Sequence, residues 1–185
     1  MTTSAPLASS VVLITGVMAA GKSTVAQALA ERLPKAAHVR GDTFRRMCVS
    51  GRVEMGAPGA PEAAEALAQL RLRHRLSAAA ADLYAADGWT AVVQDIVIGP
   101  ELAAYTDLVR TRPLHVVVLA PSPSAVTARE SARPKTGYGP GPTVADLDRV
   151  LREETPRTGL WLDTSSQSPA ETVEEILGRL AESRV

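Results

Sequence analysis

The octapeptide Gly16-Val17-Met18-Ala19-Ala20-Gly21-Lys22-Ser23 decides the fold, because it fits the pattern G-x-x-x-x-G-K-[ST]. Glycines at both ends of such a loop let the backbone adopt conformations that other residues avoid, so that successive N–H groups converge on phosphate oxygens. A β-branched apolar run, Val11–Thr15, precedes the loop, and a helix is expected over Ser23–Leu33. The sequence therefore predicts a strand, a phosphate-binding loop and a helix in direct succession.

The residues of this loop have separate expected tasks. Lys22 is expected to reach the β- and γ-phosphates of a nucleoside triphosphate, and the hydroxyl of Ser23 is expected to ligate Mg²⁺. The positive N-terminal end of the following helix points at the same anion. ATP and GTP both stay open as the nucleotide. The nucleotide contacts are assigned to Gly16, Ala19, Ala20, Gly21, Lys22, Ser23 and Thr24.

Short apolar runs alternate with helical stretches along the rest of the chain. The runs are apolar on both faces, as a parallel sheet covered by helices requires. Besides Val11–Thr15, strands are expected at Ala37–Arg40, Ala91–Asp95, Leu114–Ala120 and Leu160–Asp163. Further helices are expected at Pro61–Ala86, Pro100–Thr111, Ser124–Ser131, Thr143–Glu154 and Ser168–Arg184. This order predicts an α/β protein, a three-layer α/β/α sandwich around a five-stranded, mainly parallel sheet.

Length and charge narrow the protein class further. The chain has 185 residues, of which 20 are Lys or Arg and 20 are Asp or Glu, so its net charge is zero. This balance gives no general attraction to nucleic acid or to a membrane surface. Residues 1–9 are expected to form a flexible N-terminus without a signal-peptide pattern, and residues 10–185 a single domain. We expect a cytoplasmic enzyme with neither nucleic-acid nor membrane partners, and an oligomer is left open.

An acidic residue follows the second expected strand. Asp42 would lie at the carboxyl end of that strand, where open α/β sheets bind ligands. There its carboxylate can accept the proton of an attacking hydroxyl group, with Arg40 and Arg46 beside it as substrate-binding residues. The alternative is that Asp42 only caps the following helix, because Gly-Asp-Thr is a good N-cap sequence.

A second acid ends the apolar strand Val92-Val93-Gln94-Asp95. Asp95 at this position is expected to hold the Mg²⁺ shell or to position substrate. Gln94 is assigned with Asp95 to substrate binding, but it is expected on the opposite face of the strand, so one of the two can be purely structural. Asp95 could instead be a capping acid or a salt-bridge partner.

The long helix before this strand carries several cations. Its buried stripe is expected to consist of Leu72, Leu76, Ala79 and Leu83. Arg71 and Arg75 then lie one turn apart, in a position to reach over the crevice towards substrate, and His74 is expected at the surface. The alternative is a solvated helix face whose arginines pair with nearby acids.

Residues 129–142 are rich in glycine, proline and cations, which is typical of a small mobile lid. Arg129 and Arg133 are expected to neutralise charge on a phosphoryl group in transfer, while the lid excludes water. The alternative is an exposed basic loop without a catalytic part.

Together these residues resemble the P-loop small-molecule kinases, and most closely the chloramphenicol phosphotransferase-like group. The resemblance extends from Val11 to the final helix and rests on the Gly16–Ser23 loop, Asp42, the Val92–Asp95 strand and the Arg129–Arg133 pattern. It implies that Asp42 is the general base and that Lys22 and the lid arginines stabilise charge.

The end of the chain carries a further likeness. The run Leu160-Trp161-Leu162-Asp163-Thr164-Ser165, followed by Ser168-Pro169, resembles the last strand and base loop of gluconate and shikimate kinases. This implies that Ser165 and its loop lie beside the nucleotide base, and that Arg129 or Arg133 flanks the purine or the phosphates.

The resemblance implies a phosphotransferase that moves the γ-phosphate of a nucleoside triphosphate, with Mg²⁺, to a hydroxyl of an antibiotic. Arg40, Arg45 and Arg46 around Asp42, and the scarcity of aromatic residues, depart from chloramphenicol phosphotransferase and favour a polar or anionic acceptor. The alternatives are a housekeeping kinase for gluconate, shikimate, adenylylsulfate or a nucleoside, and a regulatory module that binds nucleotide without transferring phosphate.

Overall fold

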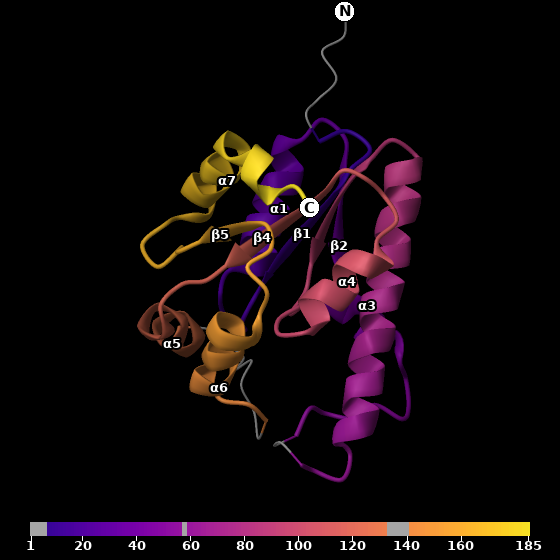
Figure 1. The fold of residues 1–185 in the computed structure, drawn as a ribbon, viewed down its shortest axis with the longest axis vertical. Helices are drawn as coiled ribbons and strands as arrows, with labels where there is room; N and C mark the ends of the chain where they lie inside the picture. Colours follow the sequence, from indigo (N-terminus) through magenta and orange to yellow (C-terminus); the bar gives the residue numbers. More distant parts are fainter. Residues whose placement is uncertain (1–6, 57–58, 133–140) are drawn as a thin grey trace, which may run out of the picture.

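The computed structural model describes residues 7–56, 59–132 and 141–185. Its centre is one five-stranded sheet with the strand order β2-β3-β1-β4-β5, in which every neighbouring pair is parallel (Figure 1). The predicted α/β fold class is confirmed. The strands are β1 (Val11–Gly16), β2 (Ala36–Arg40), β3 (Thr90–Gln94), β4 (Leu114–Leu119) and β5 (Leu160–Leu162).

Helices cover the sheet on both faces and at its carboxyl end. In Figure 1, α3 and α4 lie on one side of the sheet and α1 and α7 on the other, while α5 and α6 lie beyond the ends of the strands. The α-helices are α1 (Lys22–Arg32), α2 (Gly41–Met47), α3 (Ala63–Ala86), α4 (Glu101–Leu108), α5 (Pro123–Ser131), α6 (Val144–Arg149) and α7 (Pro169–Gly178).

The core is built on the two central strands. Every residue of β1 and of β4 is buried, as expected for parallel strands with helices on both faces. Leu7 is also fully buried, and the hydroxyls of Ser10 and Thr90 donate to its carbonyl oxygen. Leu7 therefore belongs to the packed part of the described chain.

Two helix starts carry the caps that their sequences suggest. Thr143 and Asp146 form a capping box at α6, and Ser168 and Glu171 form one at α7. The final turns differ from the expected long helices: a π-helical turn, Val150–Glu154, continues α6, and a 3₁₀ turn follows α7. Within the described residues, no helix is both long enough and apolar enough to cross a membrane.

The buried stripe predicted for α3 is wrong. Leu72, Leu76 and Leu83 are exposed, Leu83 to 73%. The buried residues of α3 are Ala66, His74, Ser77, Ala78, Ala81 and Ala85. Small side chains let the helix axis approach β3 closely, so the leucines are left on the outer side. His74, expected at the surface, is buried for the same reason.

Unfolding experiments can compare an exposed leucine of α3 with a buried leucine of α1. Leu29→Ala, at a fully buried position of α1, is expected to lower the free energy of unfolding by about 2–5 kcal/mol, because it removes core contacts and leaves a cavity. Leu83→Ala is expected to change it by no more than about 0.5 kcal/mol. Equal losses in urea denaturation of the two variants would contradict the packing of α3.

Candidate active site

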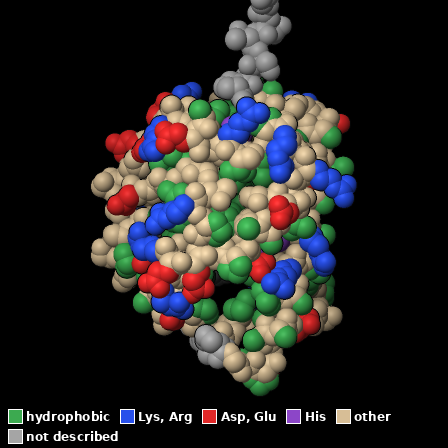
Figure 2. Space-filling view, in the orientation of Figure 1, with side chains coloured by type: hydrophobic (Ala, Val, Ile, Leu, Met, Phe, Trp, Pro, Cys, Tyr) green, Lys and Arg blue, Asp and Glu red, His purple; other side chains and the backbone are tan. Residues whose placement is uncertain are grey.

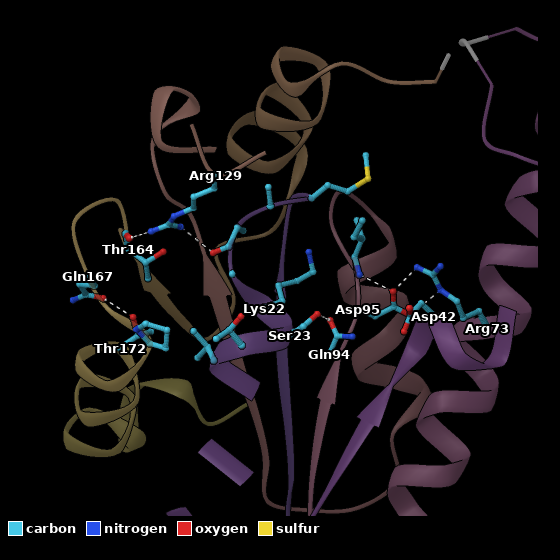
Figure 3. A pocket seen from close by; sticks show the side chains of 18 residues that line it. Lys22, Ser23, Asp42, Arg73, Gln94, Asp95, Arg129, Thr164, Gln167 and Thr172 are labelled. Carbon is cyan, nitrogen blue, oxygen red and sulfur yellow. Dashed lines mark hydrogen bonds and ion pairs between the residues drawn. The ribbon is translucent and has the colours of Figure 1, made fainter. Parts of the chain in front are cut away.

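A cavity of about 500 Å³ opens at the carboxyl ends of the strands, with the glycine-rich loop at its centre. Figure 3 shows Asp42, Asp95 and Arg73 at one end and Arg129, Thr164 and Gln167 at the other, with Lys22 and Ser23 between them. We call the first the acceptor end and the second the base end, after the acceptor molecule and the nucleotide base that the sequence analysis expects there. The remaining lining residues are Met18, Ala19, Ala20, Gly21, Thr24, Val25, Gln94, Ile96, Pro169 and Thr172.

The loop has the backbone shape that an anion cradle needs. Gly16 has a φ of 145°, and a Cβ there would lie 2.4 Å from the carbonyl oxygen of Leu119, so only glycine fits. Gly21 and Ala19 also have positive φ, at 98° and 60°. No side chain caps the start of α1. Its first N–H groups therefore face the cavity, as the N-terminus of a phosphate-binding helix does.

Lys22 and Ser23 lie at the mouth of this cradle. Lys22 is buried, and its Nζ donates to the carbonyl oxygen of Val17 at 2.6 Å. The hydroxyl of Ser23 donates to Oε1 of Gln94 at 3.2 Å. A hydroxyl and an amide oxygen side by side are ligands of the kind that Mg²⁺ accepts. These residues fit a nucleotide with its metal ion.

Asp42 lies in the first turn of α2, at the edge of the cavity. Its carboxylate forms an ion pair with Arg46, one turn further along the helix. The other oxygen, Oδ1, is buried and has no hydrogen-bond partner among the residues that the structure describes. No side chain caps α2, so the capping role considered for Asp42 is not observed. Asp42 thus has one oxygen in an ion pair and one buried oxygen without a partner among the described residues.

Asp95 is held by a cation that the sequence analysis did not select. Nε of Arg73 donates to Oδ2 of Asp95 at 2.9 Å, and Nη2 donates to Oδ1. The backbone N–H of Ile96 also donates to Oδ1, at 2.7 Å. Both side chains are largely buried, with exposed fractions of 14% for Arg73 and 3% for Asp95. Asp95 is therefore a salt-bridge partner, one of the alternatives that the sequence left open.

The neighbouring Gln94 corrects a second expectation about this strand. Both Gln94 and Asp95 line the cavity, because β3 ends at Gln94 and the alternation of faces ends with it. Gln94, rather than Asp95, contacts Ser23. The amide oxygen is therefore better placed for the metal site than the carboxylate to which the sequence analysis assigned it.

The other predicted substrate-binding arginines lie outside the cavity lining. Arg40 donates to Gln27, Arg46 pairs with Asp42, and Arg71 pairs with Glu101. Arg75 is exposed. The helix contributes Arg73 instead, because the alanine-rich face of α3 packs on the sheet and turns this residue towards β3. A stripe of small residues, Ser77-Ala78, Ala81 and Ala85, was the signal that could have found it.

At the base end, Arg129 connects two loops. Its Nη1 donates to the carbonyl oxygen of Ala20 at 3.2 Å, and its Nη2 donates to that of Thr164. Thr164 is buried, and its Oγ1 has no partner within the described part of the chain. Ser165 is not part of the lining: its hydroxyl accepts from the N–H of Ser122 and donates to Asp163.

Gln167, Pro169 and Thr172 complete this end of the cavity, and the sequence analysis did not single them out individually. Oε1 of Gln167 accepts from Thr172, and its Nε2 donates to Glu175. These contacts fix the amide of Gln167 at the wall of the cavity. Arg133, predicted as a lid cation, lies outside the described residues.

Burial keeps two histidines near the site uncharged. Burial, followed by the repulsion of Arg40, lowers the pKa of His38 to about 4, although Asp42 acts in the opposite direction. Burial also lowers the pKa of His74. At neutral pH both imidazoles are therefore neutral, and neither adds positive charge beside Asp42 or Asp95.

The fold is a kinase-like P-loop fold, and the chain belongs to the AAA domain family, which matches residues 11–157. A comparison with curated proteins gives no significant match. The narrower likeness to the chloramphenicol phosphotransferase-like group stays a prediction.

Solved structures share this fold over nearly the whole chain. A sugar kinase from Janibacter sp. HTCC2649 has 19% identity and a TM-score of 0.63, covering 93% of this chain and 94% of its own. The tunicamycin resistance protein of Deinococcus radiodurans has 17% identity and a TM-score of 0.64, with coverage of 95% and 97%. The APS kinase of Mycobacterium tuberculosis in complex with AMPPNP and APS has 18% identity and a TM-score of 0.66, with coverage of 95% and 99%.

The buried ion pair predicts a large cost of substitution. Arg73→Gln is expected to lower the free energy of unfolding by about 3–5 kcal/mol, because it leaves the buried Asp95 carboxylate without its partner. Arg32→Gln removes an exposed ion pair with Glu174 and is expected to cost no more than about 1 kcal/mol. Chemical denaturation of the two variants measures both losses. Similar losses of unfolding free energy would contradict the burial of the Arg73–Asp95 pair.

The pKa of His38 predicts a pH dependence of stability. In the unfolded chain His38 takes up a proton as the pH falls below 6.5, whereas in the folded protein it does so only near 4. The stability contribution is therefore complete above pH 6.5 and is lost as the pH falls towards 4. His38→Gln should lessen this loss in unfolding experiments between these pH values. An unchanged slope would show that His38 is not the source.

Proposed function

We propose that the chain transfers the γ-phosphate of ATP or GTP to a hydroxyl group of a small molecule. The observation that supports this most directly is the single cavity in which the phosphate cradle lies between Asp42 and the base end. A nucleotide seated on the loop would have its base near Arg129 and Thr164 and its γ-phosphate towards Asp42. A pure nucleotide-binding module has no need of a carboxylate in that position.

Asp42 is the general base in this proposal. The acceptor hydroxyl donates to one oxygen of the half-exposed carboxylate and passes its proton to it as the hydroxyl oxygen bonds to the γ-phosphorus. The bond between that phosphorus and the β–γ bridging oxygen breaks, and a nucleoside diphosphate leaves. Arg46 pairs with Oδ2 of this carboxylate and so fixes its orientation.

The loop supplies the electrostatic part of the reaction. Lys22 and the N–H groups at the start of α1 stabilise the charge that spreads over the transferring phosphoryl oxygens. Ser23 and Gln94 would hold the metal ion at the phosphates. Bound Mg²⁺ neutralises charge on the β- and γ-phosphates.

The acceptor is proposed to be an antibiotic, which a phosphate would inactivate through its charge and bulk. The fold likeness to a tunicamycin resistance protein supports this choice. The likeness to a sugar kinase supports the alternative, a metabolite with several hydroxyl groups. Because nucleoside triphosphates are made and kept in the cytoplasm, the activity is proposed to be cytoplasmic.

The test is nucleotide turnover with ATP or GTP and Mg²⁺ across a panel of hydroxylated antibiotics and polar metabolites. Asp42→Asn is expected to lower kcat by about 10²–10⁴-fold, because the amide cannot accept the proton, while nucleotide affinity is kept. Asp107→Asn, on the exposed face of α4, is the matched control and should leave turnover unchanged.

Acceptor-dependent release of the diphosphate would support phosphotransfer. Slow turnover that is indifferent to every acceptor and to Asp42→Asn would instead favour the regulatory module that binds nucleotide without transferring phosphate.

A further inference from the structure

We propose that the acceptor is an uncharged molecule, carrying hydroxyl groups but no carboxylate, phosphate or sulfate, and that the Arg73–Asp95 ion pair imposes this choice. The inference rests on the proposed phosphotransfer. It replaces the anionic acceptor suggested by the arginines around Asp42 in the sequence.

In the part of the chain that the structure describes, few basic side chains line the acceptor end of the cavity. Of the described residues that line the cavity, the basic ones are Lys22, Arg73 and Arg129. Lys22 belongs to the phosphate cradle, and Arg129 lies at the base end, as Figure 3 shows. Arg73 is thus the cation of the acceptor end, and both oxygens of Asp95 accept from it.

The arginines that suggested an anionic acceptor are also accounted for. Arg45 pairs with Glu54 and Arg46 pairs with Asp42. Arg40 donates to the neutral Gln27 and lies outside the cavity lining. Arg71, on the long helix, pairs with Glu101. Acidic and basic side chains are likewise intermingled over the face shown in Figure 2. Of the three arginines that the sequence places near Asp42, two are therefore paired with acids, and none lines the cavity.

The Arg73–Asp95 ion pair also resists displacement by a charged substrate. Both partners are largely buried, and a Cβ on Gly41 would lie 1.9 Å from Oδ2 of Asp95, so the carboxylate packs directly on the backbone. An anionic group could form a two-point ion pair through Nε and Nη2 only by displacing this carboxylate, which would stay buried without a partner. Such an exchange is strongly unfavourable. At Nη1 alone, the anion would lie beside the negative charge of Asp95 and would be repelled by it.

The same ion pair keeps hydrogen-bonding atoms that can bind hydroxyl groups of a substrate. Within the described part of the chain, Arg73 uses Nε and Nη2 for Asp95, which leaves Nη1 as a further donor. Oδ1 of Asp95 already accepts from Nη2 and from the N–H of Ile96, so Oδ2 is the oxygen that keeps a lone pair for a further donor. A hydroxyl both donates and accepts, so it can bind at the edge of the pair without disturbing it. Since Gly41 directly precedes Asp42, these hydroxyl groups would lie close to the base.

The test separates charge from shape by using two probes of similar size. With the nucleotide site saturated by AMPPNP and Mg²⁺, gluconate and sorbitol are titrated by calorimetry. The wild-type protein should not bind gluconate measurably. Asp95→Asn, which frees the guanidinium of Arg73, should raise gluconate affinity by at least about tenfold and leave sorbitol unaffected. Glu54→Gln frees Arg45 outside the cavity and should produce no gain.

Gluconate binding by the wild type that Arg73→Gln abolishes would overturn the inference, and so would the absence of any gain in Asp95→Asn. Circular dichroism checks that each variant is folded. If Asp95→Asn does not fold, wild-type kinetics decide instead: among acceptors offered both uncharged and as carboxylates, kcat/KM should favour the uncharged member by at least about tenfold.

The two proposals fail in different ways. Phosphorylation of anionic acceptors in preference to their uncharged counterparts would overturn the inference and leave phosphotransfer standing. Turnover that is independent of every acceptor would overturn phosphotransfer, while the gluconate titrations would still decide whether the cavity excludes anions.

Discussion

The position of β1 between β3 and β4 is the constraint on which the rest of the structure depends. Parallel pairing on both sides buries β1 completely and brings its last residue, Gly16, against the backbone of β4. The chain can leave the sheet there only as a tight glycine turn. The phosphate cradle therefore lies at the middle of the sheet edge, with the end of β3 on one side and the ends of β4 and β5 on the other.

Much of this arrangement could be predicted because it depends on local sequence. The Gly16–Ser23 loop, the buried apolar strands and the caps of α6 and α7 each follow from a few adjacent residues. Asp42 could be placed at the cavity for a similar reason, since the carboxyl ends of parallel strands meet at one edge. Its unpartnered oxygen could not be foreseen, because that depends on how Arg46 folds back.

The largest group of errors concerns the direction of side chains on α3. Leucines at helical spacing usually mark a buried stripe, and they led to Arg71 and Arg75. In the structure, α3 instead buries its alanine-rich face, whose small side chains allow a close approach to the sheet, and the larger leucines stay exposed. This orientation of α3 places Arg73 against Asp95. The distance between the helix and the sheet decides the orientation, and the pattern of a single sequence does not reveal that distance.

The contact between Gly41 and Asp95 has a consequence for the descent of the family. On this backbone, a side chain at position 41 and an acid at position 95 exclude each other, because the Cβ would overlap the carboxylate. Relatives that keep this geometry should therefore change the two positions together. A lineage in which Asp95 became a residue without atoms beyond Cβ would relieve most of this overlap and leave the arginine at position 73 without its acid, so it would be free to evolve a preference for a differently charged acceptor.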